Sequence, residues 1–510
     1  MSRPFYITTP IYYVNDVPHI GHAYTTVAAD VLARYRRLKG DDVFFLTGTD
    51  EHGQKVEKAA TAAGETPLEL ADRVVTRFQA LWEKLDISYT DFIRTTQERH
   101  KQGVSHFFEK VLNQGDIYLG EYEDWYCTPC ETFWTETQLI DYKCPDCNRP
   151  TEKLKEESYF FRMSKYQEQL LAHIEANPDF IQPKSRRNEI VSFVKEGLRD
   201  LSVSRTSFTW GIPVPGNPRH IIYVWFDALT NYITGLGYPD EGGNFGRYWP
   251  VDVHLIGKDI LRFHAVYWPT FLMAANLPLP KKVFAHGWWT VEGQKMSKSL
   301  QNAVEPNMLV DKYGVDAVRY FLLREVPFGL DGDFSQSAMV HRINSDLAND
   351  LGNLLSRSTA MLAKYFGGVV RQPGTLTDLD LAYRNATEEM VRQVERHLDD
   401  LAFSKALQSI WEVISAGNKY IDDTAPWALA KDPEHKERLG TIMYCMLESQ
   451  RITHSLLAAF MPTTAAKALS CLGMTGAEGE TAFTWGLLAP GTVVQKAEPL
   501  FPRIEAKEEN

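Results

Sequence analysis

The sequence of 510 residues lacks the features that would place it in several specialised classes of protein. It has no apolar run long enough to span a membrane, and its first residues, MSRPFYITTP, contain no apolar signal core. It has no internal repeat, no low-complexity tract, and neither a GxxxxGK[ST] nor a GxGxxG loop. We therefore expect a cytoplasmic protein that does not bind a membrane, and any nucleotide it uses must be held in another way.

Cysteine is scarce, with six residues, and positive charge is in deficit. Lys and Arg number 54 against 66 Asp and Glu, so the formal net charge is −12. This deficit argues against a protein that coats nucleic acid indiscriminately, but it allows one that binds nucleic acid through local contacts. The composition is otherwise globular, and the length predicts about three or four domains.

The pattern of elements divides the chain into parts. Residues 5–9 and 42–47 are predicted strands, an irregular connection over 10–18 leads to a helix that opens at His19, and residues 67–85 are a predicted helix. This order favours a parallel α/β sheet. Strand-like runs resume at 221–226 and 253–256, whereas helices dominate after about residue 335, including an amphipathic helix that ends before Pro426. The expected domains are two sheet halves at 1–115 and 218–290, an insertion at 116–217, a connecting region at 291–345 and a helical domain at 346–510.

Residues 18–22 (PHIGH) lie at a predicted strand-to-helix turn. A helix N-terminus offers unpaired N–H groups to a phosphate, and His19 and His22, three residues apart, would face the same side. Both imidazoles could then donate to phosphate oxygens, while Gly21 would let a flat ring approach the backbone. Taken alone, the segment fits equally well with two ordinary histidines that cap a helix.

Residues 293–299 (GQKMSKS) form a small, polar, cationic segment. Lys295 and Lys298 could neutralise a triphosphate, and the glycine and serines would leave such a loop mobile. The alternative is a solvated surface turn that happens to carry two lysines.

Four of the six cysteines are close in sequence. Cys127 and Cys130 form one C-x-x-C pair, and thirteen residues later Cys144 and Cys147 form a second. This spacing predicts a closed site in which four thiolates hold one structural zinc ion. Two disulfides or free thiols are the alternatives, and a reducing compartment disfavours the disulfides.

Residues 18–22 and 295–299 match the HIGH and KMSKS signatures of the class I aminoacyl-tRNA synthetases, in the right order. The sequence resembles the methionyl-tRNA synthetases over essentially its whole length, with further matching stretches at 8–15, 48–53, 224–228 and 257–264. The resemblance implies a split Rossmann-like parallel sheet with a zinc-knuckle insertion. It also implies a KMSKS loop and stem-contact region within 291–345, and an α-helical anticodon-binding domain with a C-terminal tail at 346–510.

The resemblance implies a two-step reaction. Methionine and Mg²⁺-ATP give methionyl-adenylate and pyrophosphate, and the methionyl group then passes to the 3′-terminal adenosine of initiator or elongator tRNA(Met). The catalytic residues that it implies are His19, His22, Lys295 and Lys298. The implied ATP-binding residues are His19, Gly21, His22, Gly257, Asp259 and Lys298.

The methionine site needs a carboxylate for the ammonium group and an apolar, polarisable wall for the thioether. Asp50 lies just beyond a predicted strand, where open α/β sheets bind ligands, although it could instead cap a helix. The expected methionine-binding residues are Ile11, Tyr13, Asp50, Trp225, Ala228, Tyr232, Phe263 and His264. Each aromatic residue taken alone would fit ordinary core packing, and Leu229 stands where some family members have proline.

Anticodon reading is expected in the helical domain, from Asn353, Arg357 and Trp427 by resemblance. Asn353 and Arg357 share a helix face, and Trp427 follows a helix break where it could stack on an unpaired base. The alternative is a core tryptophan and a solvated polar pair. Residues 487–510 are too few for the extra oligonucleotide-binding domain that dimerises some members, so we expect a monomer.

Three alternatives remain at this point. A class I synthetase for leucine, isoleucine or valine would carry a large editing domain, whereas the insertion here has about a hundred residues. A non-catalytic tRNA-binding paralogue would be expected to lack His19, His22, Lys298 or Asp50. A small-molecule nucleotidyltransferase would leave the helical third without a purpose. Exchange of pyrophosphate into ATP that depends on one amino acid separates these possibilities.

Overall fold

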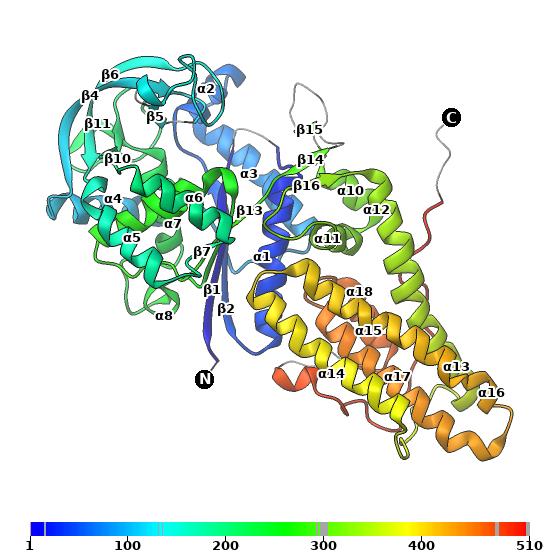
Figure 1. Cartoon of the computed structure of the whole chain (residues 1–510). Coiled ribbons are helices and arrows are strands. Elements are labelled where there is room, and N and C mark those ends of the chain that lie inside the picture. The colour runs from blue at the N-terminus through cyan, green and yellow to red at the C-terminus, as the bar shows by residue number, and fades with distance from the viewer. Residues whose placement is uncertain are drawn as a thin grey trace.

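The computed structural model describes residues 2–14, 17–130, 132–134, 136–291, 294–295, 304–474 and 479–505. Figure 1 shows a parallel sheet between two other parts, with the inserted strands β4 and β6 at one end and the helices α13 to α17 at the other. Among the described residues, no helix is long and apolar enough to cross a membrane.

A six-stranded parallel sheet forms the centre, in the order β3-β2-β1-β12-β13-β7. Its strands are β1 (Pro4–Tyr13), β2 (Asp42–Asp50), β3 (Asp91–Arg94), β7 (Ile181–Gln182), β12 (Val253–Gly257) and β13 (Val283–His286). The helices associated with it are α1 (Ile20–Leu38), α2 (Gln54–Ala63), α3 (Pro67–Lys84), α4 (Glu98–Asn113), α7 (Val224–Thr234), α8 (Asn244–Tyr248) and α9 (Trp268–Ala274). The two sheet halves meet where β1 pairs with β12, which confirms the predicted split sheet.

Two predictions about local structure were wrong. Strand β1 continues to Tyr13, where an irregular connection was predicted, because the register shifts between Thr8 and Ile11 and accommodates Pro10 at the irregularity. The predicted strand over 221–226 ends at Ile222, and α7 begins at Val224. A short apolar run does not by itself distinguish a buried strand from a buried helix.

The insertion contains an antiparallel sheet in the order β5-β4-β6-β8. Its elements are β4 (Ile117–Cys127), β5 (Thr132–Trp134), β6 (Glu152–Phe161), β8 (Leu201–Ser202), α5 (Gln167–Ala176) and α6 (Lys184–Lys195). A smaller sheet follows, formed by β9 (Ser204–Arg205), β10 (Pro213–Val214) and β11 (Asn217–Ile222). The domain boundaries stay a prediction, and strand β7, which lies within 116–217, belongs to the central sheet.

The rest of the chain is mainly helical. A small sheet has the strand order β15-β14-β16, with β14 (Trp289–Val291), β15 (Gln294–Lys295) and β16 (Gly332–Phe334). Between β15 and β16 the chain forms the helices α10 (Pro306–Tyr313) and α11 (Val315–Arg324). The C-terminal elements are α12 (Gln336–Arg342), a π-helical stretch (Ile343–Gly352), α13 (Asn353–Phe366), α14 (Asp378–Asp399), α15 (Phe403–Thr424), α16 (Pro426–Leu429), α17 (Lys436–Leu457) and α18 (Pro462–Cys471).

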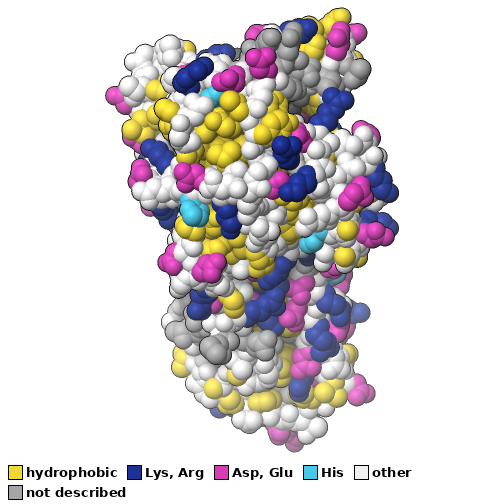
Figure 2. All heavy atoms as spheres, turned by 90° about the vertical axis from the view of Figure 1, so that its left-hand side faces the viewer, with side chains coloured by type: hydrophobic (Ala, Val, Ile, Leu, Met, Phe, Trp, Pro, Cys, Tyr) yellow, Lys and Arg dark blue, Asp and Glu magenta, His cyan; other side chains and the backbone are white. Residues whose placement is uncertain are grey.

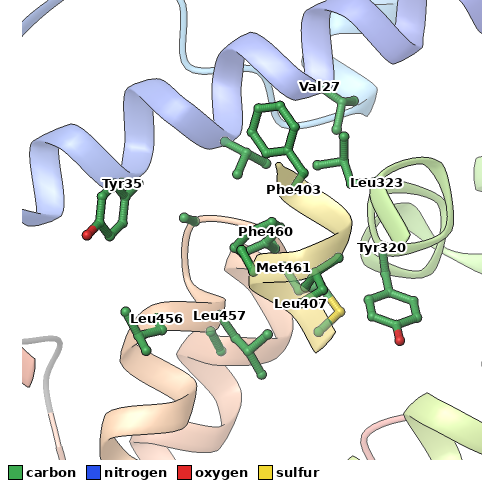
Figure 3. Close-up of a cluster of buried hydrophobic side chains, with 14 of the residues drawn as sticks. Val27, Tyr35, Tyr320, Leu323, Phe403, Leu407, Leu456, Leu457, Phe460 and Met461 are labelled. Carbon is green, nitrogen blue, oxygen red and sulfur yellow. The ribbon is translucent and has the colours of Figure 1, made fainter. Parts of the chain in front are cut away.

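Helix α1 joins the sheet to the helical part. Figure 3 shows Val27 of α1 close to Leu323 of α11 and Phe403 of α15 within one buried cluster. Beside this cluster the buried Arg319 guanidinium donates to Asp30 of α1 at 2.6 Å and to backbone carbonyls at 459 and 460. Removal of one partner from such a buried ion pair costs about 3–5 kcal/mol. The helix that begins just after His19 is therefore firmly held against the helical part.

The surface carries both signs of charge. On the face that Figure 2 shows, Lys and Arg side chains lie among Asp and Glu side chains, with apolar patches between them.

Candidate active site

Three of the residues expected to bind methionine lie at the carboxyl ends of β1 and β2. Tyr13 at the end of β1 pairs with Asp50 at the end of β2, and Ile11 pairs with Gly48. The Asp50 side chain is buried, and the residue that caps helix α2 is Gly53, so the interpretation of Asp50 as a helix cap was wrong. Ligands of open α/β sheets bind at this edge. The carboxylate of Asp50 therefore lies where it could contact a positively charged group of a ligand.

The two histidines of the PHIGH segment lie face to face at the start of α1. Their rings stack with centroids 3.7 Å apart, and His19 is the N-cap residue. The Nδ1 atom of His19 accepts from the backbone N–H of Gly21 at 3.1 Å, and Nδ1 of His22 accepts from the N–H of His19 at 3.2 Å. Each neutral ring therefore carries its proton on Nε2. The helix-capping interpretation is correct, and it leaves the His22 Nε2–H as a donor at a helix N-terminus.

Gly21 makes this stacked arrangement possible. A Cβ atom at Gly21 would lie 3.0 Å from Cε1 of the His19 ring, which is tighter than ordinary van der Waals contact. The His19 ring therefore packs against Gly21, and the approach of a ligand's flat ring to this glycine stays a prediction.

The charge state of His22 follows from its surroundings. Burial and the neighbouring His19 ring hold the pKa of His22 well below its usual range. At neutral pH the ring is an uncharged hydrogen-bond donor, and the positive end of α1 supplies the electrostatic attraction for an anion. This arrangement suits the oxygens of a phosphate group.

Four of the predicted aromatic residues form one wall. Trp225 of α7 stacks on Phe263 with ring centroids 3.6 Å apart, and the hydroxyl of Tyr232 lies 2.6 Å from Nε2 of His264. Nδ1 of His264 donates to the carbonyl of Ile260 at 3.0 Å, so Nε2 accepts the Tyr232 hydrogen bond. Ala228 lies between Trp225 and Tyr232 on α7. The result is an aromatic wall that includes one neutral histidine.

Gly257 is the last residue of strand β12, and Asp259 lies two residues beyond it. A Cβ atom at Gly257 would lie 2.5 Å from Oδ1 of Asp259, so a larger residue there would displace the Asp259 carboxylate. The exposed carboxylate of Asp259 accepts from Nε1 of Trp288 at 3.1 Å, a contact that the sequence did not predict. Trp288 in turn faces the Lys258 ammonium, 4.1 Å from its ring centroid.

The lysines of the GQKMSKS segment are the least described part of the expected site. The backbone of Lys295 belongs to β15, which pairs with β14. The side chain of Lys295 and the whole of Lys298 lie outside the described residues.

The four clustered cysteines converge as the spacing predicted. Their sulfur atoms all lie within 4.8 Å of one another, with Cys127 and Cys147 at 3.5 Å and Cys130 and Cys144 at 3.8 Å. A disulfide bond is about 2.05 Å long, so the disulfide alternative is wrong. Four sulfurs about 2.3 Å from a tetrahedral zinc ion would be roughly 3.8 Å apart, so the donor set fits zinc in type and spacing.

The three residues expected to read the anticodon lie in the helical part. Asn353 begins α13, and the Arg357 guanidinium one turn later donates to Asp422 at 3.0 Å. Trp427 in α16 is 46% exposed, so the core-tryptophan alternative was wrong. An open cavity of about 650 Å³ lies beside Asn353 and Arg357. Its other polar and aromatic lining includes Asn349, Asn418, Phe501 and Arg503, which the sequence did not suggest.

Buried charged residues beside Asp50 were also missed. Arg94 holds Glu51 with two hydrogen bonds of 2.7 and 3.0 Å, and Asp227 accepts from His52 and His100. Glu51, His52 and Asp227 lie in stretches 48–53 and 224–228, which the resemblance had marked. The pairing was hidden because His52 and Asp227 are 175 residues apart in sequence.

Two family models match the chain. The model described as class I tRNA synthetases (M) matches residues 5–155 and 148–359, and the anticodon-binding domain of methionyl tRNA ligase matches residues 370–510. Curated methionine–tRNA ligases include those of Caldanaerobacter subterraneus subsp. tengcongensis, 56% identical, and Bacillus subtilis, 53% identical. The matches cover all of this chain and 80% and 79% of those proteins.

Solved structures agree with these matches. Mycobacterium tuberculosis methionyl-tRNA synthetase in complex with methionyl-adenylate is 48% identical, with a TM-score of 0.95 over 98% of this chain and 100% of that chain. The free-state structure of the same synthetase is 44% identical, with a TM-score of 0.90 over 99% of each chain. The chain therefore belongs to the methionyl-tRNA synthetase family of class I aminoacyl-tRNA synthetases.

Proposed function

We propose that the protein activates methionine with ATP and charges tRNA(Met), both initiator and elongator. A methionine carboxylate oxygen attacks the α-phosphorus of Mg²⁺-ATP, the α–β phosphoanhydride bond breaks, and pyrophosphate leaves. The methionyl group then passes from the adenylate to the 3′-terminal adenosine, releasing AMP. The observation that carries the proposal is the stacked His19–His22 pair at the start of α1, on the sheet edge that also presents Asp50. Methionine-dependent exchange of pyrophosphate into ATP tests it.

Catalysis in this proposal rests on positioning and on the stabilisation of charge, because no covalent enzyme intermediate is needed. The Nε2–H groups of His19 and His22 donate to phosphate oxygens as negative charge moves onto the leaving group. Lys298, with Lys295, neutralises the pyrophosphate. Gly257 and Asp259 contact the ribose side of ATP, and Gly21 lies beneath the adenine.

Methionine recognition uses a buried carboxylate and the aromatic wall. Asp50 binds the α-ammonium group, and the aromatic wall surrounds the thioether, with sulfur–aromatic contacts of about 0.3–1.5 kcal/mol each. The side chains proposed for this pocket are Ile11, Tyr13, Trp225, Ala228, Tyr232, Phe263 and His264. The tuberculosis relative was solved in complex with methionyl-adenylate, which supports methionine as the amino acid that this pocket binds.

The affinity for methionine is expected to be constant from about pH 8 to pH 5.5, because the wall stays uncharged over that range. Burial lowers the pKa of His264 to about 4 and that of the neighbouring His254 well below its usual range. Only near pH 4 would a proton on Nε2 of His264 replace the hydrogen bond from Tyr232. Calorimetric titration with methionine, which remains a zwitterion throughout, measures the dissociation constant. A weakening of about tenfold by pH 5.5 would contradict a pocket whose charge is constant over this range.

Anticodon reading is proposed for Asn353, Arg357 and Trp427. Trp427→Ala is expected to lower kcat/KM for charging of tRNA(Met) by about 10- to 100-fold, because stacking on a base is worth about 1–3 kcal/mol. The methionine-dependent exchange should be unchanged, since Trp427 lies in the helical part. The matched control is Trp485→Ala, which changes a partly buried tryptophan of the same region that has no part in the anticodon proposal. Equal damage to exchange and charging by Trp427→Ala would refute the anticodon role.

One zinc ion per chain is proposed for the cysteine cluster, where it would hold the shape of the insertion. Metal analysis should find about one zinc per wild-type chain and less than about 0.2 in Cys144→Ala, since three ligands leave the tetrahedral site incomplete. The melting temperature of that variant should also fall. Cys471→Ala, which changes a cysteine far from the cluster in sequence, should keep its zinc. Full zinc occupancy in Cys144→Ala would contradict the assignment.

The monomeric state and the cytoplasmic location stay predictions.

A further inference from the structure

A buried polar cluster lies behind the proposed methionine pocket. The carboxylate of Asp227 accepts from Nδ1 of His52 at 2.7 Å on one oxygen and from Nε2 of His100 at 2.7 Å on the other. The second nitrogen of His100 lies 2.7 Å from the hydroxyl of Thr234. All four side chains are buried, with Asp227 and His100 at 0% exposure. None of them has a role in the mechanism proposed above.

The carboxylate is ionised in this cluster. Burial raises the pKa of Asp227, but the two histidines outweigh that effect and lower the pKa to about 2. A ring nitrogen that faces an ionised carboxylate at 2.7 Å must carry a proton. His52 therefore donates through Nδ1 and His100 through Nε2, so the two rings use opposite nitrogens.

The cluster connects the two sides of the pocket. His52 lies two residues after Asp50, in the segment that follows β2, and Asp227 lies two residues after Trp225, in the first turn of α7. His100 holds Asp227 from the other side, from helix α4. Helices α4 and α7 approach closely, because a Cβ atom at Gly103 would lie 2.3 Å from Cγ2 of Thr234. The charged side of the pocket and its aromatic side therefore share one buried anchor.

Further contacts to Glu51 and His52 hold the segment that follows β2. Nε1 of Trp210 donates to the carbonyl of Glu51 at 2.6 Å, and the Trp210 ring packs edge-on against His52 at 5.5 Å. Arg94 fixes the Glu51 carboxylate from the opposite side. These contacts hold the segment at Glu51, and the hydrogen bond from His52 to Asp227 links it to α7.

We propose that His52, Asp227 and His100 form a positioning cluster that sets the distance between Asp50 and the aromatic wall, and so determines the affinity for the amino-acid substrate. The three residues act through Asp50 and Trp225 and do not touch the reacting atoms. The proposal rests on the methionine pocket of the proposed function.

His52 and His100 donate to Asp227 through different ring nitrogens, so substitution by Asn or by Gln should have opposite effects at the two positions. The side-chain amide of Asn places its nitrogen near the position of a histidine Nδ1, and that of Gln places it near Nε2. His52→Asn and His100→Gln therefore keep the donor to Asp227, whereas His52→Gln and His100→Asn misplace it. Steady-state exchange kinetics measure KM for methionine and KM for ATP in all four variants.

The misplaced variants are expected to raise KM for methionine by about tenfold or more, since a buried carboxylate loses one charge-assisted hydrogen bond. KM for ATP should stay within about twofold, because the ATP contacts begin at α1 and β12. The donor-keeping variants should stay within about threefold of wild type for both substrates. Similar KM values for methionine in all four variants, or parallel rises for both substrates, would overturn the proposal.

A buried carboxylate elsewhere in the sheet provides the control. Asp252, just before β12 and at the opposite end of the strands, accepts from the backbone N–H of Tyr6 and from Lys281, both at 2.8 Å. Asp252→Asn should lower the melting temperature and leave both KM values unchanged. Asp227→Asn should lower the melting temperature as well and also raise KM for methionine. If Asp227→Asn affects stability alone, the cluster is structural only and the proposal fails.

The wild-type protein allows a measurement that does not depend on the folding of variants. A ¹H–¹⁵N spectrum of the histidine rings should show a protected Nδ1–H for His52 and a protected Nε2–H for His100, and both signals should shift when methionine is added. The opposite tautomers, or signals that methionine leaves unmoved, would overturn the proposal. Failure of the wild type to catalyse methionine-dependent exchange would refute the proposed function instead.

Discussion

Asp50→Ala is expected to lower kcat/KM for methionine by about 100- to 1,000-fold in pyrophosphate exchange. Removal of one partner from a buried, hydrogen-bonded charge pair costs about 2–5 kcal/mol, and each 1.4 kcal/mol is tenfold. Asp50 is buried at the end of β2 and pairs in register with Tyr13, so a substrate ammonium group beside it would be largely removed from water.

The loss should fall mainly on KM for methionine, because the ammonium group keeps its charge in the transition state. Asp50→Asn, which keeps the size of the side chain and removes its charge, should behave like Asp50→Ala. Asp252→Asn again provides a buried carboxylate outside the site. A KM for methionine within about threefold of wild type in Asp50→Ala would exclude Asp50 from the pocket.

His22→Ala is expected to lower the rate of adenylate formation by about 100- to 1,000-fold, which is the usual effect of removing one preorganised donor to a developing negative charge. The Nε2–H of His22 is fixed by the backbone hydrogen bond to Nδ1, so the donor is in place before the reaction. Single-turnover formation of the adenylate measures the effect, and the dissociation constant for methionine should change little.

His22→Gln, whose amide nitrogen falls near the position of Nε2, should restore part of the rate. His435→Ala removes an exposed histidine of the helical part and should have no effect. If His22→Ala instead weakens the binding of methionine and ATP with an unchanged rate, the histidine binds the ground state and does not stabilise the transition state.

The sequence predicted those features whose evidence is local. Helix α3 was predicted within one residue of its ends, because its apolar residues recur at helical spacing. The stacking of His19 on His22 follows from a three-residue separation at a helix start, and the four cysteines converge because their spacing is typical of a knuckle. Each of these predictions depends on fewer than about 25 consecutive residues.

Features that depend on the topology could not be predicted. The contact of His52 with Asp227 exists because β2, α4 and α7 meet at one place, and no local pattern encodes that meeting. Phe501 and Arg503 line the cavity beside Asn353 because the chain returns there after α18. The helical start of α7 was missed because residues 221–226 are all apolar, and only their packing decides where the strand ends.

The formation of an aminoacyl-adenylate at this site is tested most directly by pyrophosphate exchange into ATP, measured with the purified protein and one amino acid at a time. We expect exchange with methionine and none above background with leucine, isoleucine or cysteine. Exchange with one of those three in place of methionine would assign the aromatic wall to a different substrate. The absence of exchange with every amino acid would contradict the central claim that this site forms an aminoacyl-adenylate.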